Sequence, residues 1–148
     1  MEIAILALGC FWGPEQKFSK IEGIIRTEVG YCGGNTENTT YKDVCTGATN
    51  HAEVVKLEYD EKTITYEDIL EYFFEFHDPT TLNSQGYDFG TQYRSEIFYL
   101  NEKQKMSAEK IIEAENKKLN GKVVTQLSLL KNYCTAEEYH QKYLDKKF

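Results

Sequence analysis

Residues 2–18 read EIAILALGCFWGPEQKF, and this stretch sets the start of the fold. Residues 2–8 are an apolar run of the length of one buried strand, and Gly9 ends it. A helix is expected to follow and to run to about Lys20. Pro14 suits its first turn, because the N–H that proline lacks would be unpaired at a helix start in any case. The stretch therefore predicts a buried strand, a turn and a helix.

The rest of the chain consists of strands and helices with two long loops among them, and a loop as long as 32–50 is usually functional or mobile. The order of these elements predicts an α+β fold in a single domain over residues 1–148. More specifically, we expect a two-layer sandwich with a ferredoxin-like βαββαβ core and long active-site loops. The expected strands are 24–31, 51–59, 94–100 and 123–130, the expected helices 65–76, 102–119 and 136–144, and the loops 32–50 and 78–93.

Composition excludes several classes of protein. The 148 residues are 41% hydrophobic and 28% charged, which is ordinary globular usage and not that of a disordered chain. With 17 Lys and Arg against 24 Asp and Glu, the net charge of −7 argues against nucleic acid and anionic membrane surfaces as partners. The longest apolar stretch, 3–12, is too short to span a bilayer, and no basic region precedes it as in a signal peptide. We therefore expect a cytoplasmic protein.

Four cysteines, Cys10, Cys32, Cys45 and Cys134, could suggest two disulfides. In a reducing cytoplasm, however, cysteines are more often catalytic, metal-binding or simply buried. The chain has no C-x-x-C pair, and the cysteine spacings match no standard zinc pattern, so no metal site is expected.

Cys10 follows the first strand and stands at the start of the first helix. Unpaired backbone N–H groups and the helix dipole favour an anion there, which would lower the pKa of the thiol. The alternative is a buried cysteine that acts as a small hydrophobic residue, and the position alone does not decide between them. Phe11 and Trp12 could form an apolar wall beside the sulfur, suited to a small apolar group that carries a polar atom, or could pack in the core.

Seven blocks of sequence resemble those of the A-type peptide methionine sulfoxide reductases, in the order that this family has them. They cover nearly the whole chain, which makes the resemblance very specific. The blocks are GCFWGPE at 9–15, GYCGG at 30–34, TYKDVCTG at 40–47, HAEVV at 51–55, HDP at 77–79, DFGTQYRS at 88–95 and AEEYHQ at 136–141.

The resemblance implies a reaction at Cys10. Its thiolate would attack the sulfur of a methionine sulfoxide while the sulfoxide oxygen is protonated, which releases methionine and leaves a cysteine sulfenic acid. Glu53, Tyr41 and Tyr93 match the positions where the family holds and protonates the oxygen. As the acid, Glu53 would have to be buried in order to stay protonated near neutral pH. Asp88 matches a supporting acidic position of the family's active site.

Phe11 and Trp12 match the pocket that receives the methyl group of the substrate. Each assignment has an alternative in the residues themselves. Glu53 could face solvent in its strand, and Tyr41 and Tyr93 could be packing residues among eleven tyrosines. The three histidines also lie inside the matched blocks, and we interpret them as structural. They are His51, His77 and His140.

Regeneration of the enzyme leaves two hypotheses open. Many family members carry resolving cysteines in a C-terminal tail that this chain lacks, and others carry one where this chain has Gly13. In the first hypothesis, which we favour, an external thiol attacks the Cys10 sulfenic acid directly. In the second, Cys134 or Cys32 forms an internal disulfide that thioredoxin reduces. Cys45 is expected to be a packing residue.

The resemblance thus implies a single catalytic domain that reduces methionine S-sulfoxide, free or in proteins, for protein repair under oxidative stress. No cofactor is expected beyond a thiol reductant, which could be thioredoxin, glutaredoxin with glutathione, or dithiothreitol. We also expect a monomer. Two rival functions are a thiol peroxidase, which would need a cationic donor such as Arg94 near Cys10, and a non-catalytic module that binds methionine peptides.

Overall fold

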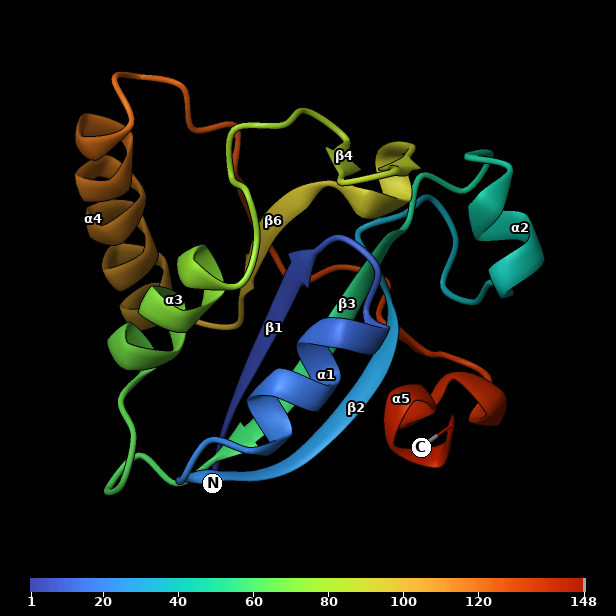
Figure 1. The fold of residues 1–148 in the computed structure, drawn as a ribbon, viewed down its shortest axis with the longest axis horizontal. Coiled ribbons are helices and arrows are strands. Elements are labelled where there is room, and N and C mark those ends of the chain that lie inside the picture. Colours follow the sequence, from blue (N-terminus) through green and yellow to red (C-terminus); the bar gives the residue numbers. More distant parts are fainter. Residues whose placement is uncertain (148) are drawn as a thin grey trace.

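The computed structural model describes the backbone of residues 1–147 and the side chains as far as Asp145. Its core is a six-stranded sheet in the order β7-β6-β1-β3-β2-β8, with β1 and β3 at its centre (Figure 1). All neighbouring pairs are antiparallel except β6 with β7, which is parallel, so the sheet is mixed. The strands are β1 (Glu2–Leu8), β2 (Ile24–Cys32), β3 (Ala52–Tyr59), β6 (Ser95–Tyr99), β7 (Gln126–Leu129) and β8 (Cys134–Thr135).

Three helices lie close to their predicted places, α1 (Trp12–Ser19), α3 (Tyr66–Glu75) and α4 (Glu102–Lys118). The helix α3 begins with the predicted capping box. The Asp68 N–H donates to the Thr65 hydroxyl at 3.1 Å, and the Thr65 N–H donates to the Asp68 carboxylate at 3.2 Å. None of the helices in the described part of the chain is long and apolar enough to cross a bilayer.

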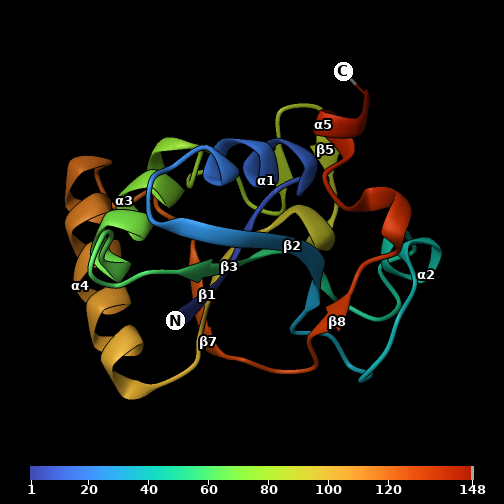
Figure 2. The ribbon, with the colours of Figure 1, turned by 90° about the horizontal axis from the view of Figure 1, so that it is seen from below.

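The alternation of side chains along β1 divides the core between the two faces of the sheet. Leu6 and Leu8 point toward α1 and α3, where they pack with Phe18 of α1 and Phe73 of α3. On the other face, residues such as Ile5 and Phe98 are covered by the segment between β7 and β8. Figure 2 shows α1 and α3 on one side of the sheet and this segment on the other.

The two long loops contain elements that are too short to be recognised from the periodicity of the sequence. The first loop holds α2 (Tyr41–Cys45), which Thr40 caps by accepting the Asp43 N–H. The second loop holds a hairpin of β4 (Ser84–Gln85) and β5 (Asp88–Phe89), followed by the 3₁₀ turn η1 (Thr91–Tyr93). Both loops lie at the end of the sheet where β1 finishes and β3 begins (Figure 1).

The prediction of a helix at 136–144 is wrong. After β8 the chain instead forms the 3₁₀ turn η2 (Glu138–His140) and then the short helix α5 (Tyr143–Lys147). Hydrogen bonds to the edge of β2 replace those of a helix in this segment. The Val29 carbonyl accepts the Ala136 N–H, and the Gln141 side chain bonds both backbone groups of Val29. Lys142, at φ 51°, then separates η2 from α5. Tertiary pairing has overridden local helical spacing.

Candidate active site

Cys10 lies in the turn between β1 and α1, partly exposed at the end of the sheet. Gly9 makes this turn possible, since its φ of 93° disfavours other residues and a Cβ there would lie 2.7 Å from the Gln85 side chain. The backbone N–H of Trp12, the first residue of α1, donates to the Cys10 sulfur. The start of α1 therefore faces the thiol, as the sequence predicts.

The pKa of Cys10 nevertheless contradicts the expectation of a thiolate at neutral pH. Burial raises the pKa of the thiol to about 12, and the negative charges of Glu53 and Asp88 add to this effect. The single hydrogen bond from Trp12 opposes burial but does not outweigh it. This pKa keeps Cys10 a neutral thiol at pH 7.

Glu53 lies on β3, on the same face of the sheet as α1. It is only 1% exposed, so the alternative of a solvent-facing residue is wrong. Its Oε1 accepts the Phe11 N–H at 3.3 Å, and its Oε2 accepts the Gln92 side-chain amide at 3.4 Å. Burial is the main cause that raises the pKa of Glu53 to about 7, and the charge of Asp88 raises it further. Near neutral pH this carboxyl can hold or release a proton.

Tyr41 and Tyr93 come together from the two long loops. Tyr41 begins α2, Tyr93 ends η1, and their side chains are hydrogen-bonded to each other. Burial raises the pKa of Tyr93 to about 12, with Glu53 as the next cause, and burial raises the pKa of Tyr41 as well. Both phenols are therefore neutral donors at pH 7, and both are partly exposed. Asp88 is exposed on β5, with its charge close enough to act on Tyr93.

Phe11 and Trp12 differ in their exposure. Phe11 is 1% exposed and packs with Tyr31 of β2 at a ring distance of 5.8 Å, so it belongs to the core as well as to the site. Trp12 is half-buried, and its indole N–H donates to His140 Nδ1 at 3.1 Å. Tyr143 of α5 stacks on Trp12 at 3.8 Å. Trp12 is thus the more accessible part of the apolar wall.

Two glutamates that the sequence analysis did not single out fix the walls of the site. Glu15 is buried in α1 and accepts the Thr27 hydroxyl at 2.9 Å and the Lys142 N–H at 2.6 Å. Glu137 accepts the Tyr31 hydroxyl at 2.8 Å and the Tyr41 N–H at 2.9 Å. Both lie inside the matched blocks, but the residue type gives no sign of these distant partners.

The three histidines make structural contacts. His140 is the acceptor for Trp12, and His77 bonds the Phe73 carbonyl and the Ser95 hydroxyl. Burial lowers the pKa of His77 to about 4, so it is neutral. His51 is fully buried near backbone groups of the loop that carries α2.

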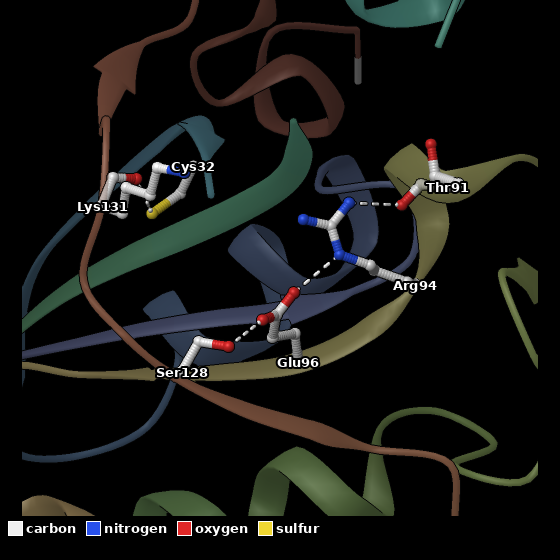
Figure 3. A network of polar contacts seen from close by, with 6 residues as sticks. All are labelled: Cys32, Thr91, Arg94, Glu96, Ser128 and Lys131. Atoms are coloured by element: carbon white, nitrogen blue, oxygen red, sulfur yellow. Dashed lines mark hydrogen bonds and ion pairs between the residues drawn. The ribbon is translucent and has the colours of Figure 1, made fainter. Parts of the chain in front are cut away.

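All four cysteines are free thiols. Of the three besides Cys10, only Cys45 contacts residues around Glu53. Cys32 is fully buried on the opposite face of the sheet, where its thiol donates to the Lys131 carbonyl at 3.2 Å (Figure 3). Cys134 is half-buried on the edge strand β8, with its sulfur 3.7 Å from the Thr39 carbonyl. Neither is brought to Cys10.

Cys45 corrects another expectation, because it is exposed rather than packed. Its sulfur accepts the Gln92 amide at 3.4 Å and is hydrogen-bonded to the Tyr41 side chain. Among the described residues, no group of three or more His, Cys, Asp and Glu side chains could hold a metal ion.

Arg94 does not supply the free cation that a thiol peroxidase would need. Its Nε lies 2.6 Å from the Glu96 carboxylate, and its Nη1 donates to the Thr91 carbonyl at 2.9 Å.

The site thus brings together a thiol, a carboxyl that titrates near neutral pH and two phenol donors beside an aromatic wall. This set of groups defines a thiol oxidoreductase whose substrate presents an apolar group next to an oxygen acceptor.

Comparison with known proteins agrees with this class. The profile of the family described as peptide methionine sulfoxide reductase matches residues 2–148. A peptide methionine sulfoxide reductase MsrA from Pelagibacter ubique (strain HTCC1062) is 71% identical over 147 residues, which are 99% of this chain and 100% of that protein. The chain therefore belongs to the peptide methionine sulfoxide reductases, oxidoreductases that reduce methionine sulfoxide and thereby repair proteins.

Solved structures support the same assignment. The reduced form of Mxr1 from Saccharomyces cerevisiae has a TM-score of 0.93 and 42% identity, covering 98% of this chain and 84% of that one. Mxr1 in complex with Trx2 has a TM-score of 0.68 and 28% identity, covering 96% of this chain and 84% of that one.

Proposed function

We propose that Cys10 is the nucleophile and Glu53 the proton donor in the reduction of methionine S-sulfoxide, free or in proteins. The observation that carries this proposal is the buried Glu53 carboxyl, whose pKa of about 7 suits proton transfer at neutral pH and whose charge acts directly on the Cys10 thiol. An acid with an ordinary pKa would be almost fully ionised at pH 7 and would take up the proton that it must pass to the sulfoxide oxygen much less readily.

The protons and electrons of this step balance. Above pH 7 the pair is mainly a Cys10 thiol with a Glu53 carboxylate, and moving one proton from sulfur to carboxyl gives the reactive thiolate and acid. The thiolate attacks the sulfoxide sulfur while Glu53 protonates the oxygen. Oxygen then passes to Cys10 as a sulfenic acid and methionine leaves, so cysteine is oxidised by two electrons and the sulfoxide is reduced by two.

Donors and apolar surface around Cys10 fit the two ends of a methyl sulfoxide. The neutral phenols of Tyr41 and Tyr93 can donate to the sulfoxide oxygen, while Asp88 supports their orientation. The methyl group would lie against Phe11 and Trp12. Preorganised donors that stabilise the charge developing on the oxygen in the transition state are usually the largest contribution to lowering the reaction barrier.

The oxidised enzyme is regenerated by an external thiol in this proposal. Cys32 lies across the sheet and Cys134 on an outer strand, so neither is poised to attack Cys10. A thioredoxin-like protein fits the role, because the related Mxr1 forms a complex with Trx2. Glutaredoxin with glutathione, or dithiothreitol, would serve by the same chemistry, and no cofactor takes part.

We further propose a ferredoxin-like two-layer scaffold, a monomeric state and a cytoplasmic location. The antiparallel order β6-β1-β3-β2, with α1 and α3 on one face, supports the scaffold. The four free thiols suit a reducing compartment. Gel filtration with light scattering tests the monomer.

Turnover of methionine S-sulfoxide by Cys10→Ser tests the central proposal. We expect no methionine from this variant. In the wild type, one equivalent of substrate without reductant should remove one free thiol and leave a sulfenic acid that dimedone traps. Methionine production by Cys10→Ser would overturn the mechanism, and loss of two thiols in the wild type would show an internal disulfide instead. Hydrogen peroxide serves as the control substrate and should not be turned over at a comparable rate.

A further inference from the structure

Gln92 has no part in the chemistry described so far, yet it is one of the most buried polar residues of the site. It is 5% exposed on η1, and its Nε2 lies 3.4 Å from both Glu53 Oε2 and Cys45 Sγ. We propose that Gln92 is a positioning residue: its amide orients the Glu53 carboxyl for proton transfer, and the buried Arg94–Glu96 pair fixes the turn that carries Gln92. This inference rests on the role of Glu53 proposed above.

A glutamine suits a carboxyl that alternates between two protonation states. The Phe11 N–H can only donate, and it holds Oε1 of Glu53. The Gln92 amide can donate from Nε2 to a carboxylate and, after rotation, accept at Oε1 from a carboxylic acid. It therefore has a favourable geometry before and after the proton is transferred. The 3.4 Å separation is long for a hydrogen bond, as is common in sites without substrate.

The charges around Glu53 show why this neutral donor matters. Among the described residues, the titratable groups shown to interact with Glu53 are one carboxyl, one thiol and three phenols, and no cation is among them. The Glu53 carboxylate is thus stabilised by hydrogen bonds from Phe11 and Gln92, against burial and against these neighbouring groups. The neighbouring groups are Cys10 before α1, Tyr31 on β2, Tyr41 on α2, Asp88 on β5 and Tyr93 on η1.

Gln92 itself depends on a network behind the turn (Figure 3). A single 3₁₀ turn has little stability of its own. Arg94 fastens it by donating from Nη1 to the Thr91 carbonyl at 2.9 Å, and Nε of Arg94 lies 2.6 Å from Glu96 Oε1. The Ser128 hydroxyl on β7 donates to the other Glu96 oxygen at 2.6 Å. Arg94 and Glu96 are 6% and 3% exposed, so solvent does not compete for these bonds.

The Gln92→Met variant tests the proposal, because methionine has a similar length and cannot donate. The titration of Glu53 is followed by infrared spectroscopy, with the carboxyl band assigned by its absence in Glu53→Gln. We expect the titration midpoint, near 7 in the wild type, to move to higher pH in Gln92→Met. We also expect kcat to fall by about tenfold or more and KM by less than about twofold in either direction. Gln126→Met, an exposed change on β7, is the matched control and should alter neither.

Ser128→Ala provides a second test that leaves the site residues intact. Loss of its hydrogen bond to Glu96 should move the Glu53 midpoint in the same direction by a smaller amount. An unchanged midpoint in Gln92→Met, or a shifted midpoint with an unchanged kcat, would overturn the positioning role. Failure of the proposed function looks different, since Glu53→Gln would then keep the turnover of the wild type.

Discussion

The indole N–H of Trp12 donates to Nδ1 of His140 at 3.1 Å, which joins the first motif of the chain to the last. His140 can accept this bond only when Nδ1 is unprotonated. Burial lowers the pKa of His140 and so favours the neutral ring. Since Tyr143 also stacks on Trp12, the C-terminal segment fixes the plane of the indole in the proposed substrate wall.

Lowering the pH should therefore break the hydrogen bond from Trp12 to His140 and leave the indole less firmly held. Because the folded pKa of His140 is below its ordinary value of 6.5, the unfolded chain binds more protons, and stability is lost as pH falls below about 6.5. Trp12 is the only tryptophan, so its fluorescence reports the bond directly. We expect an emission change below pH 6.5 in the wild type that is missing in His140→Phe. The same change in both proteins would contradict this assignment.

Much of the fold and of the site could be predicted from the sequence, and the failures have physical causes. The strand and helix that flank Cys10 follow from local pattern, and the resemblance placed Glu53 and the two tyrosines correctly in one region. The expectation of a lowered pKa for Cys10 is wrong because burial of the thiol outweighs its one backbone hydrogen bond. Gln92 was missed because an amide carries no reactivity that a motif could signal.

Glu53→Gln separates the two effects of this carboxyl. Removal of the acid should lower kcat by about 100-fold or more, in the range expected for general acid catalysis. Removal of its negative charge should also lower the pKa of Cys10, because that charge raises it in the wild type. Alkylation rate against pH measures the thiolate fraction. The exposed Glu61→Gln is the control and should leave both kcat and the alkylation profile unchanged.

His77 makes the fold sensitive to acid at a distance from the reaction. Its folded pKa of about 4 lies below the ordinary 6.5, so the unfolded chain binds more protons between these values. Stability should fall as pH decreases through this window, by up to about 1.4 kcal/mol for each pH unit. Urea unfolding of the wild type and of His77→Gln at pH 7 and pH 5 measures the effect. A similar loss in both proteins would assign the sensitivity to other groups.

Cys32 and Cys134 should prove dispensable for regeneration. Cys32 lies on the opposite face of the sheet from Glu53, and exposing its sulfur to Cys10 would require breaking the pairing of β2 with β3. Cys32→Ala should therefore keep the turnover with thioredoxin, while losing about 1 kcal/mol of stability as a buried side chain is shortened. Cys134→Ser should keep both turnover and stability, because its sulfur is half-buried at an edge.

The same two variants decide how the sulfenic acid is resolved. With direct attack by an external thiol, both variants lose one free thiol on reaction with substrate, as the wild type does, and each yields a dimedone adduct. If Cys134 resolved Cys10, the wild type would lose two thiols and Cys134→Ser only one, with turnover by thioredoxin falling at the same time. Cys45→Ala belongs in the same series, since Cys45 is exposed and its sulfur is hydrogen-bonded to the side chains of Gln92 and Tyr41. A drop from two lost thiols to one in that variant alone would assign the resolving role to the loop that carries α2.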